Sequence, residues 1–151
     1  QKQVGIVWAG NPTHANDKNR SATVEDFMPI LQVPNTRFYS LQVGDRANDI
    51  ALLSPDLPMQ DLSARLVNYG DTAAVIEQLD LVITVDTSVA HLAGALHKPV
   101  WTLLCYNPDW RWLLERNDTP WYPSMRLFRQ STPKDWTTVC HQVAEALKLE
   151  G

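Results

Sequence analysis

Four polar residues that can hold an anion or move a proton fall within six consecutive positions of the sequence: Asp86, Thr87, Ser88 and His91. Hydroxyl and imidazole groups donate hydrogen bonds to phosphate oxygens, and a carboxylate can orient such donors. Asp86, Ser88 and His91 are also the three residue types of a hydrolytic triad. Residues this close together at a strand end and a helix start do not easily form the relay geometry of a triad. The spacing therefore favours an anion site over a nucleophile.

The residues around this group predict a strand, a sharp turn, a helix and a second strand. Residues 81–85 are a continuous apolar run rich in β-branched residues, typical of a parallel strand buried on both faces. From Val89 the apolar residues recur at helical spacing until Lys98 and Pro99, and residues 100–105 are a second apolar run. The amino end of such a helix lies beyond the carboxyl ends of the strands, where its unpaired N–H groups and its dipole attract a phosphate.

A simpler interpretation of the same residues stays open at this point. Asp86 or Thr87 could serve only as a cap for the helix. His91 would then be a half-exposed surface residue with no ligand.

The order of the predicted elements indicates one α/β domain over residues 1–151, with a Rossmann-like, doubly wound, mostly parallel sheet. We expect strands at residues 3–8, 37–42, 59–62, 81–85, 100–105 and 126–128, and helices at 24–31, 49–53, 73–79 and from Thr132 onwards. The predicted helix caps are Thr23 with Asp26, Asp71 with Thr72, and Thr132 followed by Pro133.

Two further loops are expected at the carboxyl edge of this sheet. The connection after the first strand is long and polar, and its Lys18 and Arg20 could neutralise phosphate charge while Asn11 donates a hydrogen bond. The loop after the second strand contains Gln42 and Gly44, which we also assign to the anion site. A solvated loop without a ligand is the alternative for the first connection.

Composition narrows the class of protein. The chain has 151 residues, 44% hydrophobic and 20% charged, which is ordinary for a globular domain. A net charge of −4 argues against a general nucleic-acid or membrane-surface binder, and no apolar run approaches a membrane span. Cys105 and Cys140 fall in predicted core elements, which suits reduced thiols in the cytoplasm. Because a strand begins almost at once, we expect the chain to be part of a longer protein.

Several standard sites are excluded. The six glycines are too scattered for a dinucleotide fingerprint or a P-loop, and no GxSxG nucleophile elbow is present. The end of the first strand, Trp8-Ala9-Gly10, lacks the acidic pair of a phosphoacceptor domain. The four histidines fall on separate elements without ligand spacing, so we expect no metal and no cofactor.

Three segments of the sequence resemble a known family: VWAGNPTHANDKNRS, YGDTAAVIEQLDLVITVDTSVAHLAGALHKPVW and PDWRWLLERNDTPWYPSMRLFRQ. They look like the carboxyl-terminal half of a GT-B glycosyltransferase, closest to the heptosyltransferase-like glycosyltransferase family 9. Within that family they resemble the bacterial proteins that carry tetratricopeptide repeats ahead of this domain. The resemblance covers essentially the whole chain.

The resemblance implies that this half binds a nucleoside-diphosphate sugar, while an amino-terminal half supplies the acceptor site and the general base. Asp86, Thr87, Ser88 and His91 match the donor-binding motif, Asp17-Lys18 matches the basic position of the first loop, and Gly44 matches a loop glycine near the nucleotide. Heptosyltransferases usually have glycine where this chain has Ser88, so the sugar is not fixed by the resemblance.

The mechanism implied is metal-independent inverting sugar transfer, with the isolated domain inactive. The nucleobase, the sugar, the acceptor and the oligomeric state are not determined by the sequence. Two alternatives stay open: a degenerate interaction module that docks through Trp110, Trp112 and Trp121, and a nucleotide-sugar epimerase-like domain. Trp110 and Trp112 could equally wall the ligand pocket or pack within the domain.

Overall fold

The computed structural model describes most of the chain. The described residues are 2–10, 21–53, 57, 59–105, 124–130, 132 and 135–150.

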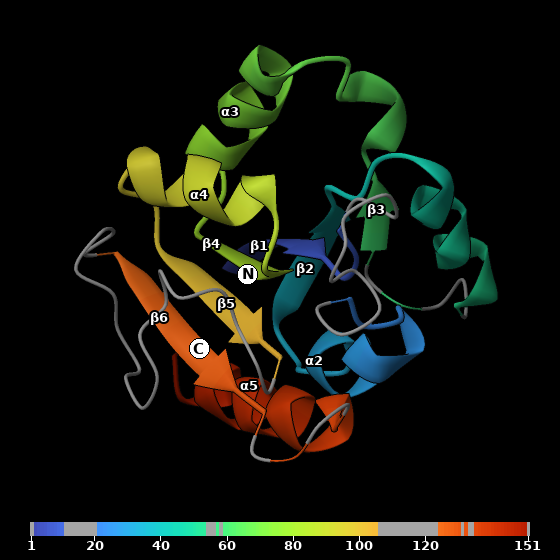
Figure 1. Cartoon of the computed structure of the whole chain (residues 1–151), viewed down its shortest axis with the longest axis vertical. Coiled ribbons are helices and arrows are strands. Elements are labelled where there is room, and N and C mark those ends of the chain that lie inside the picture. The colour runs from blue at the N-terminus through green and yellow to red at the C-terminus, as the bar shows by residue number, and fades with distance from the viewer. Residues whose placement is uncertain are drawn as a thin grey trace.

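The described part of the chain forms a six-stranded, all-parallel sheet (Figure 1). The strand order across the sheet is β3-β2-β1-β4-β5-β6, the order of a doubly wound Rossmann-like fold. The strands are β1 (Lys2–Val7), β2 (Thr36–Ser40), β3 (Met59–Asp61), β4 (Leu81–Val85), β5 (Val100–Leu104) and β6 (Met125–Arg129). This architecture confirms the predicted fold class.

Helices cover both faces of the sheet. Helices α3 (Tyr69–Glu77) and α4 (Ser88–Ala95) lie on one face, and α2 (Met28–Leu31) and α5 (Trp136–Glu150) on the other (Figure 1). Short 3-10 segments complete the described elements: η1 (Glu25–Phe27), η2 (Asp45–Leu52) and η3 (Ser63–Arg65). Among the described residues, no helix combines the length and the apolar composition needed to cross a membrane.

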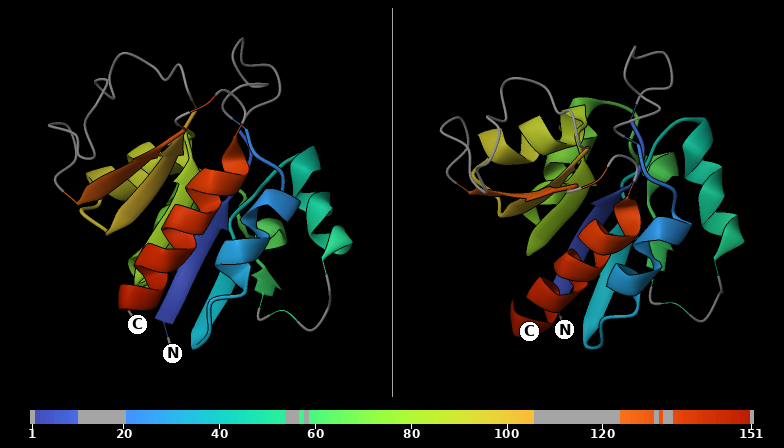
Figure 2. Two further views of the ribbon diagram at one scale, coloured as in Figure 1. Left: turned by 90° about the horizontal axis from the view of Figure 1, so that it is seen from below. Right: turned by 60° about the horizontal axis from the view of Figure 1, so that its bottom comes forward.

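The central strands carry the core because helices cover them on both sides. All five residues of β4 and all five of β5 are buried, as their continuous apolar runs predict. Figure 2 shows α2 and α5 side by side on one face, and both pack into the larger of two apolar clusters. The start of β1 and the end of α5 lie together, and the ammonium of Lys2 is 3.2 Å from a carboxylate oxygen of Glu150.

The predicted cap of the first helical segment is confirmed. The backbone N–H of Thr23 donates to Asp26, and the backbone N–H of Asp26 donates to the hydroxyl of Thr23, at 2.9 and 3.1 Å. Pro29 lies in the first turn of α2, and the segment divides there into η1 and a single α-helical turn. This division agrees with the expectation that the proline shortens or kinks the helix.

Two other predicted caps are wrong. Helix α3 begins earlier than predicted, because Asn68 and Asp71 satisfy each other's backbone N–H groups in a capping box. Helix α5 begins at Trp136, not near Thr132, and the side chain of Asp135 accepts from the backbone N–H of Thr138 at 3.1 Å. In both helices, the side chain of the residue before the helix accepts from the backbone N–H three residues later: Asn68 from Asp71, and Asp135 from Thr138.

Cys140 is a fully buried thiol on the core face of α5. Burial raises its pKa to about 12, with a smaller contribution from the negative charge of Asp26. The thiolate is the reactive form of cysteine, so Cys140 is chemically inert while the domain is folded.

We therefore expect Cys140 to resist alkylation at pH 8 in the folded protein and to react readily in denaturant. The pKa moves from 9.0 in the unfolded chain to about 12, so the unfolded state loses its proton first as pH rises. The free energy of unfolding should fall as pH rises above 9, through the range in which only the unfolded thiol ionises. Mass spectrometry after iodoacetamide treatment measures the first effect, and denaturant titrations at several pH values measure the second. Equal labelling of Cys140 in the folded and denatured protein would contradict this assignment.

Candidate functional site

The predicted loops after three strands reach the same edge of the sheet. Strand β1 lies between β2 and β4, and all three are parallel, so their carboxyl ends are neighbours. The chain runs outward from β1 through β2 to β3, and then in the opposite direction from β4 through β5 to β6. The boundary between β1 and β4 is therefore the topological switch point, where doubly wound sheets bind ligands.

Helix α4 presents its amino end at this edge because it directly follows β4. Thr87 is the N-cap residue, with an extended backbone (φ −140°, ψ 172°), and its side chain makes no capping hydrogen bond. No acidic residue occupies the first turn of α4, in contrast to α3, whose first turn holds Asp71. The first residue of the helix, Ser88, is exposed to solvent. The positive end of the α4 dipole is thus left without a compensating charge in its own first turn.

The hydroxyl of Thr87 turns back toward the sheet. Its Oγ1 lies 3.0 Å from the Oγ1 of Thr84, the penultimate residue of β4. Thr84 is fully buried, and its hydroxyl also donates a hydrogen bond of 2.8 Å to the carbonyl of Val85. Sequence reasoning did not single out Thr84, although it is a hydroxyl in a strand that is otherwise apolar.

Asp86 and His91 lie close to each other across the first turn of α4. The Nε2 atom of His91 is 3.8 Å from the Oδ1 atom of Asp86, and the two side chains are 25% and 12% exposed. This separation exceeds hydrogen-bond length, so the contact is an ion pair when the imidazole is protonated. The structure thus brings together all four residues of the predicted group Asp86, Thr87, Ser88 and His91 at one helix end.

Gln42 has a different position from the one expected of a residue that contacts a ligand. Its side chain is buried, and its Oε1 accepts from the backbone N–H groups of Trp8 and Ala9, at 3.0 Å each. Its Nε2 donates to the carbonyls of Ala9 and Val43, at 2.9 and 3.4 Å. These four bonds use the full hydrogen-bonding capacity of an amide group. Gln42 therefore ties the end of β1 to the end of β2.

Gly44 and the residues after it form the next part of the edge. Gly44 has φ 79° and ψ −164°, a conformation that only glycine adopts without strain, and η2 starts at the following residue. Arg46 in η2 donates to Asp49 and to the carbonyl of Ala22, both at 2.9 Å. These bonds fasten η2 to the segment that follows β1. Sequence reasoning also missed Arg46, whose place just after Gly44 was the available signal.

Seven of the residues assigned to the site or to a docking surface lie outside the described residues: Asn11, Asp17, Lys18, Arg20, Trp110, Trp112 and Trp121. The residues that flank the first loop are described. The N–H of Gly10 donates to the hydroxyl of Ser21 at 2.9 Å, and the N–H of Ala22 donates to the carbonyl of Trp8 at 2.8 Å. Both ends of the loop are therefore held at the carboxyl end of β1.

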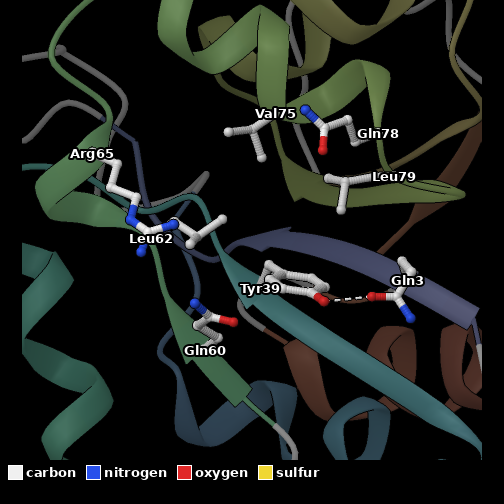
Figure 3. A pocket seen from close by; sticks show the side chains of 8 residues that line it. All are labelled: Gln3, Tyr39, Gln60, Leu62, Arg65, Val75, Gln78 and Leu79. Atoms are coloured by element: carbon white, nitrogen blue, oxygen red, sulfur yellow. Dashed lines mark hydrogen bonds between the residues drawn. The ribbon is translucent and has the colours of Figure 1, made fainter.

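A separate cavity of about 350 Å³ lies beside α3, on the face of β1, β2 and β3 (Figure 3). Tyr39 donates a hydrogen bond to the side chain of Gln3 on its floor. The described residues that line it are Gln3, Tyr39, Gln60, Leu62, Arg65, Val75, Gln78 and Leu79. None of the predicted site residues is among them. Within the described ranges, no group of three His, Cys, Asp or Glu side chains is placed to hold a metal ion.

Comparison with known protein families identifies a matching family. The profile of glycosyltransferase family 9 (heptosyltransferase) matches residues 51–145, more than half of the chain. The chain is also 30% identical over 153 residues to Protein FlbA of Caulobacter vibrioides. That alignment covers 97% of this chain but 25% of FlbA, so the chain spans about a quarter of this relative.

Solved structures match the fold. E. coli heptosyltransferase WaaC with ADP-2-deoxy-2-fluoro heptose matches with a TM-score of 0.70 at 15% sequence identity. E. coli ADP-heptose lps heptosyltransferase II matches with a TM-score of 0.63 at 14% identity. Each match covers 99% of this chain but only 43% and 48% of the respective solved chain. The domain therefore has the fold of part of a GT-B heptosyltransferase.

We expect Gln42→Ala to destabilise the fold strongly, because it leaves two buried N–H groups without acceptors. The expected loss in free energy of unfolding is roughly 2–4 kcal/mol. The exposed Gln78 offers a matched control, and Gln78→Ala should change stability by less than about 0.5 kcal/mol. Urea unfolding followed by circular dichroism measures both variants. Equal stability of the two would show that the amide of Gln42 does not tie the strand ends.

Proposed function

Since this chain belongs to glycosyltransferase family 9, the heptosyltransferase family, we propose that it is the donor-binding half of a GT-B sugar transferase. Its ligand is a nucleoside-diphosphate sugar, and the diphosphate binds at the amino end of α4. The single observation that carries this proposal is the uncapped start of α4 at the switch point of the sheet.

The charge distribution around α4 supports an anionic ligand. Ser88 at the first helical position is exposed and offers a hydroxyl donor next to the open N–H groups. The carboxylate of Asp86 would repel a diphosphate if it stood alone. Its contact with His91 compensates that charge when the imidazole is protonated, and the imidazole can then donate toward the ligand. Lys18 and Arg20 of the first loop remain the proposed cations for the outer phosphate oxygens.

The proposed reaction breaks the bond between the anomeric carbon of the sugar and the diphosphate oxygen. An acceptor hydroxyl attacks the anomeric carbon from the opposite side and loses its proton to a base. Negative charge grows on the departing diphosphate, and the fixed N–H groups of α4 stabilise it without having to reorganise. In this proposal the base and the acceptor site belong to another part of a longer polypeptide, because the chain spans less than half of the heptosyltransferase structures it matches.

The identity of the donor is proposed by analogy. WaaC is seen with ADP-2-deoxy-2-fluoro heptose and with ADP, and heptosyltransferase II is an ADP-heptose enzyme, so an adenosine diphosphate sugar is the first candidate. Ser88 replaces the glycine expected from the family resemblance, so the sugar need not be a heptose. Both cysteines are buried and neither forms a disulfide, in keeping with a proposed cytoplasmic location. An association with tetratricopeptide repeats is likewise a proposal.

Binding can be tested directly with ADP, GDP and UDP. We expect at least one of them to shift the NMR signals of residues 86–91, with weaker effects at the far edge of the sheet near Asn35. Calorimetry on the same samples gives the affinity. If none of the three nucleotides shifts residues 86–91, the domain does not bind a nucleoside diphosphate at α4, and a role as an interaction module is favoured.

A charge placed at the start of α4 gives a second test. Ser88→Asp adds a negative charge where the helix dipole tolerates it, so folding should be preserved. The same charge lies within a few ångströms of the proposed diphosphate and should weaken nucleotide binding about tenfold or more. Asn35→Asp adds an equal charge before β2, at the opposite edge of the sheet, and should leave binding unchanged. Equal affinities for the two variants would place the diphosphate elsewhere.

A further inference from the structure

Thr84 is a buried residue of β4 that controls the open end of α4. We infer that it is a positioning residue: it holds the hydroxyl of Thr87 away from the helix and so keeps the first N–H groups available for the diphosphate. This inference rests on the proposed function, because it explains how the anion site stays open. It adds a residue that touches no ligand itself.

Thr87 behaves unusually for its position. Threonine at an N-cap normally accepts a hydrogen bond from the second or third N–H of its helix, here Val89 or Ala90. The side chain of Thr87 makes no such bond, and its N-cap backbone is extended as in ordinary capped helices. The Thr87 hydroxyl instead lies 3.0 Å from Thr84. The N–H of Ala90 already donates to the carbonyl of Thr87 at 3.1 Å. The N–H of Val89 lacks a side-chain cap because the Thr87 hydroxyl points elsewhere.

Counting hydrogens gives the direction of these bonds. A threonine hydroxyl has one hydrogen to donate. The carbonyl of Val85 can only accept, so the hydrogen of Thr84 goes to that carbonyl at 2.8 Å. Thr84 must then accept from Thr87 at 3.0 Å. The hydroxyl of Thr87 is consequently a donor toward the sheet interior. Its rotamer is fixed by Thr84, whose own hydroxyl is held by the carbonyl of Val85.

The buried position of Thr84 indicates that its hydroxyl has a structural role. Thr84 is fully buried in β4, where the other four residues are apolar, and burying a hydroxyl costs free energy unless it is hydrogen-bonded. Thr102 is its register partner on β5, is equally buried, and has a hydroxyl with no hydrogen-bond partner among the described residues. The two threonines thus share an environment and differ in their contact with Thr87.

Removing the Thr84 hydroxyl should close the site. In Thr84→Val a methyl group replaces the acceptor, and the Thr87 hydroxyl is free to rotate onto the N–H of Val89. The diphosphate then competes with this cap. A cap bond of this type corresponds to about a fivefold change in affinity, or ~1 kcal/mol. Thr84→Ser keeps a hydroxyl at the same place and should restore wild-type binding.

The experiment compares ADP, GDP and UDP affinity in the wild-type protein and in three variants: Thr84→Val, Thr84→Ser and Thr102→Val. We expect about fivefold weaker binding in Thr84→Val alone. Hydrogen exchange by NMR without nucleotide gives an independent measurement. The amide of Val89 should exchange more slowly in Thr84→Val, because the new cap protects it, and should be unchanged in the other two variants. The amide of Ala90 already donates to the carbonyl of Thr87 and serves as an internal reference.

A double-variant cycle separates positioning from general damage to β4. In a Thr87→Val background there is no hydroxyl to release, so adding Thr84→Val should not weaken binding further. Loss of affinity that persists in this background, or equal loss in Thr84→Ser or Thr102→Val, would overturn the inference. If the wild-type protein binds nucleotide and Thr84→Val binds it equally well, only this inference fails. If the wild-type protein binds none of the three nucleotides, the proposed function fails and this inference falls with it.

Discussion

The parallel pairing of β1 with β4 is the constraint on which the rest of this domain depends. It makes β1 the strand from which the two halves of the chain wind in opposite directions. The helices that follow these strands leave on different faces, and a gap is left between their starts at the carboxyl edge. The four polar residues from Asp86 to His91 fall at this gap because they directly follow β4. A different neighbour for β1 would separate them from the loops after β1 and β2.

Bonds between side chains and backbone then keep this edge in shape. Gln42 joins the ends of β1 and β2, and Ser21 closes the base of the first loop through Gly10. Arg46 bonds to Asp49 within η2 and links η2 to the carbonyl of Ala22. All three side chains are polar and lie at the edge where the ligand is expected. Their actual partners are backbone groups or a neighbouring carboxylate, so they provide a rigid frame in which a helix end can be preorganised.

Much of this fold could be predicted from hydrophobic patterns. Each described strand begins and ends within two residues of its predicted bounds. The central strands β4 and β5 are continuous apolar runs, whereas β2 alternates buried and half-buried residues. The caps of α3 and α5 were mispredicted because several short polar residues precede each helix, and only three-dimensional geometry shows that Asn68 and Asp135 accept the bonds. Gln42 was assigned to the ligand from its place in a loop, which does not reveal where its amide points. Thr84 was missed because a β-branched residue in a strand needs no further explanation.

The replacement of glycine by Ser88 can be understood from the geometry of the helix start. A glycine is required only where a side chain would obstruct the backbone or where φ is positive, as at Gly44. Ser88 begins an ordinary α-helix and its side chain is exposed, so the backbone at this position accepts a Cβ atom without strain. The proposed anion site is therefore a helix end without a glycine-rich loop, and the inferred role of Thr84 is to hold back its capping hydroxyl. Under this proposal the first helical position needs no particular side chain.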